Sequence, residues 1–137
     1  MRIDGAKGAP TRTVDLTEFF DRPTHVTIRI MSPFGRALIR EIAMETFEVG
    51  EVDSKGRTAD IRTNPKGQAD REMRTRATKL SHSFAGTDMT ADGQPVVWGK
   101  DLWDALDETD PRILDAVVAE IDRFSKLVEP EGEANPT

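Results

Sequence analysis

Four residues in the C-terminal half have the spacing of a calcium-binding loop. The positions matching the first, third, fifth and sixth ligand-loop residues are Asp88, Thr90, Asp92 and Gly93. The twelfth position must supply a bidentate carboxylate, and it is Gly99 here; Pro95 also interrupts the segment expected to pair. We therefore predict no metal site, and a tight hairpin turn at Asp92-Gly93, because such turns need positive φ at both central residues.

The two histidines do not complete a catalytic arrangement. His82 is flanked by Ser81 and Ser83, which are possible nucleophiles, whereas His25 lies far away in the sequence. A serine nucleophile needs an adjacent base and a third group that orients the base. The sequence has neither a Gly-x-Ser-x-Gly elbow nor an evident orienting group. We interpret both histidines as surface or partly packed residues.

A dense group of carboxylates could in principle perform acid–base chemistry. Its members are Asp101, Asp104, Asp107, Glu108, Asp110 and Asp115. Asp101, Asp104 and Glu108 share one helical face by their spacings of three and four. Leu102, Trp103 and Leu106 alternate with them, which indicates the solvated side of an amphipathic helix. With zero cysteines, thiolate chemistry is also excluded. We expect a protein that is not an enzyme and uses no cofactor.

The charges divide the chain into a basic middle and an acidic C-terminal half. Residues 55–79 carry eight basic and three acidic residues, whereas residues 80–137 carry four basic and thirteen acidic ones. Such a division favours pairing of opposite patches, within the molecule or head-to-tail between copies in a homo-oligomer. The basic segment, from Arg71 through Arg74 and Arg76 to Lys79, could instead follow a phosphate backbone. It lacks interleaved aromatic residues, and the acidic half would repel nucleic acid, which argues against that function.

These residues must be positioned by one small α+β domain rich in helix. A chain of 137 residues is long enough for one core. Residues 14–128 form the expected domain, between a disordered arm at 1–13 and a flexible tail at 129–137. No apolar run spans a membrane and no signal peptide is evident, which fits a cytoplasmic protein.

The expected elements begin with N-terminal extended structure. Val14–Phe20 fits a short strand or a single helical turn, and Val26, Ile28 and Ile30 alternate as the buried face of a strand. A β-hairpin is expected near 86–98. Residues 51–66 are poorly patterned and fit a loop or a small hairpin equally well.

Four helices are expected, at 33–48, 68–84, 100–107 and 111–128. Ser32-Pro33 and Asp110-Pro111 are start signals, since a capping side chain precedes a proline whose missing donor costs nothing. The second helix has a thin apolar stripe through Met73, Leu80 and Phe84. The last helix has a broad buried face, formed by residues at spacings of three and four: Leu114, Val117, Ile121, Phe124 and Val128.

The segment 84–128 resembles the small tail assembly chaperones of long-tailed bacteriophages. The resemblance rests on an aromatic residue, a small polar linker, Asp-x-x-x-Asp-Gly-x-Pro-Val from Asp88 to Val96, a short helix, Asp110-Pro111, and a final helix ending in Phe124-Ser125. A weaker likeness covers Val14–Ile30. No catalytic signature accompanies the match.

The resemblance implies an assembly factor in the host cytoplasm that is absent from the mature virion. Members of the family are thought to coat the tape measure protein, keep it soluble and recruit tail tube subunits around it. By this resemblance we expect a protein-binding surface built from apolar residues and from the basic helix: Phe84, Val97, Trp98, Trp103, Arg71 and Arg74. Either tryptophan could instead be a core residue. Two alternatives stay open: a small acidic inhibitor that mimics nucleic acid, and a basic-helix nucleic-acid binder.

Overall fold

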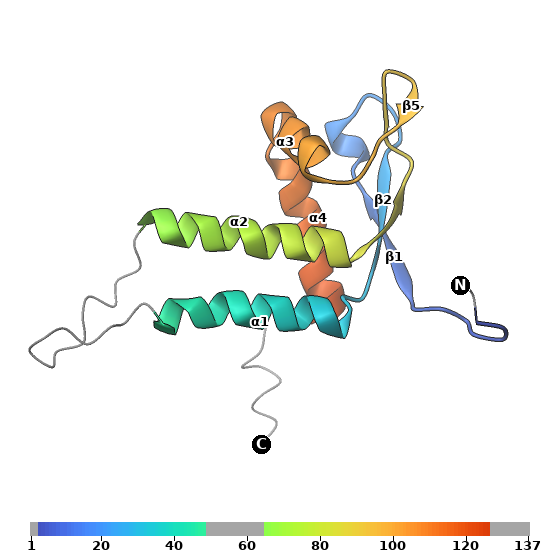
Figure 1. Ribbon diagram of the computed structural model, residues 1–137. Helices are drawn as coiled ribbons and strands as arrows, with labels where there is room; N and C mark the ends of the chain where they lie inside the picture. The colour runs from blue at the N-terminus through green and yellow to red at the C-terminus, as the bar shows by residue number, and fades with distance from the viewer. Residues whose placement is uncertain (1–2, 49–64, 127–137) are drawn as a thin grey trace, which may run out of the picture.

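The computed structural model describes residues 3–48 and 65–126, which form one α+β unit (Figure 1). Its elements are β1 (Thr11–Asp15), a 3₁₀ turn (Thr17–Phe19), β2 (His25–Arg29), α1 (Pro33–Glu48), α2 (Pro65–His82), β3 (Phe84–Thr87), β4 (Thr90–Ala91), β5 (Gln94–Pro95), α3 (Lys100–Thr109) and α4 (Arg112–Ser125). The predictions for residues 51–64 and for the tail at 129–137 lie outside the described residues.

A three-stranded antiparallel sheet of order β1-β2-β3 packs against α4. The buried face of β2, Val26 and Ile28, meets the apolar face of α4, where Ile113, Leu114 and Val117 are fully buried. Leu16, Met31, Leu80, Trp103 and Leu106 complete this core. The broad apolar face predicted for the last helix is therefore the centre of the fold.

The predicted start signals and hairpin are confirmed. The Ser32 hydroxyl accepts a hydrogen bond from the Gly35 amide at 3.1 Å, and the Asp110 carboxylate accepts one from the Arg112 amide at 3.0 Å. Asp92 and Gly93 have φ of 52° and 77°, and they connect β4 to β5.

The second predicted helix extends too far at its C-terminal end. α2 ends at His82, and Phe84 begins β3, which pairs with β2. The spacing between Leu80 and Phe84 suits a helix, but the Ser83 carbonyl accepts a hydrogen bond from the Arg29 amide at 2.8 Å, so a long-range strand pairing overrides the local pattern. Met73, predicted in the apolar stripe, is 52% exposed.

Two N-terminal predictions also need correction. β1 starts at Thr11, inside the predicted arm at 1–13, because its β-branched residues pair with β2 from Thr11↔Arg29 onward. The segment Val14–Phe20 contains both predicted alternatives, because it includes the end of β1 and then a single 3₁₀ turn. Ile30 is predicted beside Val26 and Ile28, yet it is 36% exposed, since the strand ends at Arg29 and Met31 is buried in its place.

α1 and α2 pack side by side and extend beyond α4 as a two-helix arm (Figure 1). We call this pair the arm. α4 crosses the arm near the C-terminal part of α2, where the Lys79 ammonium lies 2.9 Å from the Asp122 carboxylate. The crossing leaves a corner between the arm and α4.

Candidate functional site

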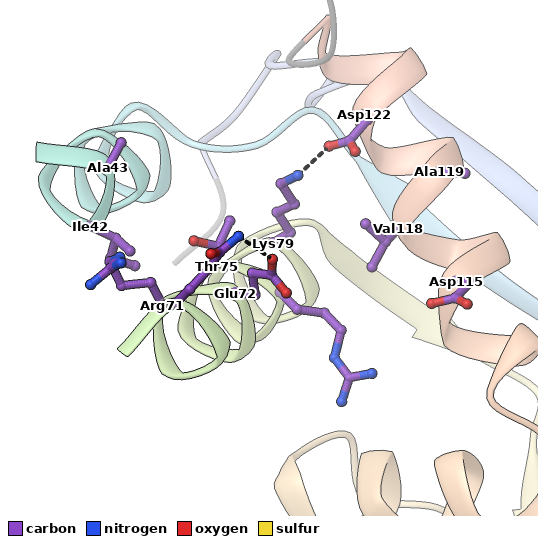
Figure 2. A pocket seen from close by; sticks show the side chains of 12 residues that line it. Ile42, Ala43, Arg71, Glu72, Thr75, Lys79, Asp115, Val118, Ala119 and Asp122 are labelled. Atoms are coloured by element: carbon purple, nitrogen blue, oxygen red, sulfur yellow. Dashed lines mark hydrogen bonds and ion pairs between the residues drawn. The ribbon is translucent and has the colours of Figure 1, made fainter. Parts of the chain in front are cut away.

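A hollow of about 640 Å³ occupies the corner between the arm and α4 (Figure 2). α2 contributes one long side, from Gln68 to Lys79. The rest of the lining comes from α1 and α4: Ile42, Ala43, Asp115, Val118, Ala119 and Asp122. At a rise of 1.5 Å per residue, the α2 side is about 16 Å long, the length of roughly three helical turns.

The local sequence explains why this corner is not filled. α4 directs its strongest apolar positions at the sheet, so only Val118 and the small Ala119 face the arm. α1 offers Ile42, which is 8% exposed, together with the exposed Ala43. The small Ala43 and Ala119 side chains do not fill the corner, and the apolar surface stays accessible to a partner.

Ion pairs connect the basic helix to the acidic ones. Arg76 donates two hydrogen bonds to the Asp107 carboxylate of α3, at 2.7 and 3.2 Å. Lys79 reaches Asp122 of α4, with the two side chains only 17% and 14% exposed. The predicted pairing of opposite patches therefore occurs within the molecule.

Three charged groups of the hollow, Arg71, Glu72 and Asp115, have no such partner in the described part of the chain. Within residues 3–48 and 65–126, neither Arg71 on α2 nor Asp115 on α4 forms an ion pair. Figure 2 shows them on opposite sides of the hollow. Arg74, by contrast, points to α1, where its Nη1 donates a 2.9 Å hydrogen bond to Glu45, and its Nε donates to Asp70 at 3.0 Å. The hydrogen bond with Arg74 lowers the pKa of Glu45.

The predicted aromatic contacts form a separate cluster. The Phe84 and Trp98 rings stack with centroids 4.4 Å apart, and Trp98 meets Trp103 edge-on at 6.0 Å. Trp98 donates its indole N–H to the Leu80 carbonyl at 2.9 Å, and Trp103 is only 7% exposed. Trp103 of α3 is thus a core residue, and the partly buried Trp98 attaches the segment after the hairpin to the core. Val97, 85% exposed, is the one of these four residues that projects fully into solvent.

Three of the remaining candidates for chemistry, Asp88, His25 and His82, have structural partners. Both carboxylate oxygens of Asp88 bind His25: one accepts from the His25 amide at 2.7 Å and the other lies 2.9 Å from Nδ1. This contact raises the pKa of the His25 imidazole and lowers that of Asp88. His82 packs edge-on against Phe34, with ring centroids 5.6 Å apart. The acids on α3, Asp101, Asp104 and Glu108, are all exposed.

Sequence reasoning predicted Arg71 but not the walls opposite it. Asp115, Val118, Ala119 and Asp122 recur at spacings of three and four, so they form a second face of the last helix, beside its buried face. That periodicity is the signal that could have indicated a surface for another helix.

No known protein family, curated protein or solved structure matches this chain or its fold. None of the described helices is long and apolar enough to cross a membrane.

Proposed function

We propose that this protein is a non-enzymatic binding module that holds an α-helix of another protein in the hollow between the arm and α4. The observation that carries the proposal is the composition of the hollow: small and apolar side chains at its base, bordered by charges from two helices. Helix-in-groove recognition uses such a surface, because an amphipathic helix buries its apolar stripe and places its flanks against polar walls.

Outside the hollow, the arm leaves further apolar side chains uncovered. Phe34, Met44 and Met73 are 66%, 57% and 52% exposed on its two helices. Methionine is common on surfaces that adapt to helical partners, since its side chain is flexible and polarisable. A second helix alongside the arm would bury apolar area that the monomer leaves in water.

The resemblance of segment 84–128 supplies the identity of the partner in this proposal. The protein is a phage tail assembly chaperone, the bound helices belong to the tape measure protein, and tail tube subunits are recruited to the resulting complex. The protein acts in the host cytoplasm and is absent from the mature virion. Val97 at the hairpin end is the proposed additional apolar contact.

Site-specific photo-crosslinking tests this function. Three exposed helical alanines form a matched set: Ala43 and Ala119 line the hollow, whereas Ala105 lies on α3 outside it. A benzophenone amino acid at Ala43 or Ala119, but not at Ala105, should crosslink to a co-expressed tape measure protein encoded near the gene. Crosslinks that map to helical segments are the expected result.

Two findings would contradict the proposal. One is equal crosslinking from all three positions. The other is a gene neighbourhood without tail tube or tape measure genes, which would remove the phage assignment. A second readout is solubilisation of the tape measure protein, which Ala43→Glu and Ala119→Glu should abolish. Two controls should retain this activity: Ala105→Glu and the neutralised triple variant Asp101→Asn/Asp104→Asn/Glu108→Gln. The acidic-inhibitor alternative requires the triple variant to fail.

A further inference from the structure

The charges that border the hollow are sorted by helix. Of its lining residues, α2 contributes three cations, Arg71, Arg76 and Lys79, and one acid, Glu72, whereas α4 contributes two acids, Asp115 and Asp122, and no cation. One wall is therefore net basic and the opposite wall net acidic (Figure 2).

Half of these six charged groups are already in ion pairs inside the molecule. Arg76 is paired with Asp107 and Lys79 with Asp122, whereas Glu72 accepts a 3.4 Å hydrogen bond from the neutral Gln68 amide and keeps its charge. Arg71, Glu72 and Asp115 are left without an ion pair in the described part of the chain, and Figure 2 shows Arg71 and Asp115 on opposite sides of the hollow. A ligand can pair with these groups without breaking an internal ion pair, although the charge of Arg71 also acts on Glu45 of α1.

We infer that the bound helix has split flanks, with acidic side chains along the flank that meets Arg71 and basic ones along the flank that meets Asp115. The inference rests on the proposed function and adds the charge pattern of the partner. A helix can present this charge pattern because residues three and four apart share a flank. A single stretch of about three turns therefore holds an apolar stripe between two charged rows. A ligand with one sign of charge on both flanks would meet repulsion at one wall.

A pair of designed peptides provides the probe. Both are stapled helices of ~18 residues, about 27 Å long, with the same leucine stripe. One carries glutamate on one flank and lysine on the other, and its control carries glutamine on both. Circular dichroism verifies equal helicity. We expect the split-charge peptide to bind wild-type protein roughly tenfold tighter than the glutamine peptide, with about threefold from each wall, as exposed ion pairs provide.

Variants of the protein test whether the tighter binding of the split-charge peptide comes from Arg71 and Asp115. Arg71→Gln and Asp115→Asn should each remove about threefold of it, and the double variant should bind both peptides equally. Both positions are at least partly exposed, so the fold should tolerate these changes. Glu72→Gln, which removes the one acid from the basic wall, should increase the advantage.

The results of these binding experiments test the split-flank inference separately from the proposed helix-binding function. If both peptides bind equally, and Ala119→Glu blocks both, helix docking stands and the split-flank inference is wrong. An advantage that persists in Arg71→Gln/Asp115→Asn overturns the inference as well, because the charges then contact other residues. If neither peptide binds at millimolar concentration, the docking of helices in this hollow fails, and the inference fails with it.

Discussion

The arm and α4 show two ways in which helices of one protein are stabilised. α4 has 14 residues and buries four large apolar side chains to 1% exposure or less, namely Ile113, Leu114, Val117 and Ile121. The arm has 16 and 18 residues in its two helices, and among its described side chains only Ile42 and Leu80 are buried large hydrophobic ones. α4 is stabilised by apolar packing, whereas the arm depends on charge pairs and on a small number of buried apolar side chains.

This difference indicates which region of the molecule should gain stability when a partner binds. Most helical stability in proteins comes from packing of an amphipathic face. A helix pair with little packing of its own is stabilised by any partner that binds the folded form, through mass action. The arm is therefore the region whose stability should respond to a bound helix, and the core around α4 should not.

The largest expected effect is a loss of core packing at Leu114. Leu114→Ala should destabilise the fold by about 2–5 kcal/mol, because it leaves a cavity at a fully buried site. The matched control is Leu38→Ala on α1, where the side chain is half-buried and the cost should be about 1 kcal/mol. Urea denaturation of both variants measures the difference. Equal losses would show that the arm is packed as tightly as the core.

The next effect concerns a tightly packed place in the arm, at Gly35. An added Cβ at Gly35 would lie 2.7 Å from the His82 Cβ and 2.9 Å from the Met31 Cγ. Gly35→Ala should therefore cost about 1–3 kcal/mol through overpacking. Gly86→Ala is the control, since a Cβ there meets nothing within 4 Å. A neutral Gly35→Ala variant in thermal unfolding would mean that the start of α1 can move away from α2.

A smaller effect is expected from the charge contact that fixes the arm to α4. The Lys79 ammonium lies 2.9 Å from Asp122 Oδ1 without the alignment of a hydrogen bond, and both side chains are largely buried. Lys79→Met should cost about 1–2 kcal/mol, less than a fully buried pair, because water still screens the site.

The exposed pair Lys100–Asp104 serves as its control, with side chains 82% and 49% exposed. Lys100→Met should change the free energy of unfolding by less than about 0.5 kcal/mol. Restoration of stability in the double variant Lys79→Met/Asp122→Leu would confirm that the cost arises from an unpaired carboxylate. If Lys79→Met has no more effect than Lys100→Met, the arm is not attached to α4 by this contact.

The sequence predicted the elements that local chemistry determines. Ser32-Pro33, Asp92-Gly93 and Asp110-Pro111 each act through neighbouring backbone groups, so their patterns sufficed for the helix starts and the hairpin. β3 was missed because its pairing with β2 joins residues about 60 positions apart, such as Val26 and Thr87, and no local periodicity reports that. Phe84 fitted a helical stripe equally well.

The candidate site was predictable only in part for the same reason. Arg71 was identified from its charge, but the hollow exists because α4 crosses the arm, and a crossing of distant helices has no local signature. Trp98 and Trp103 were expected as possible anchors on size. The stacking of Trp98 on Phe84 and its edge-on contact with Trp103 depend on how the hairpin folds back on α2, which composition does not reveal.

The smallest expected effect is a pH dependence at the sheet, on the α4 side of the comparison. The hydrogen bond with Asp88 raises the pKa of His25 above its ordinary value of 6.5, so the imidazolium form stabilises the fold below pH 6.5 and this contribution is lost as pH rises through the higher folded value. The lowered pKa of Asp88 preserves the contact above pH 3.8. Urea midpoints between pH 5 and 8.5 should therefore fall with pH, and His25→Gln should flatten the slope. His82→Gln, which alters the other histidine, should leave the slope intact. A slope that survives His25→Gln but disappears in His82→Gln would place the titrating group at the arm instead, where Phe34 meets His82, and would reverse this part of the comparison.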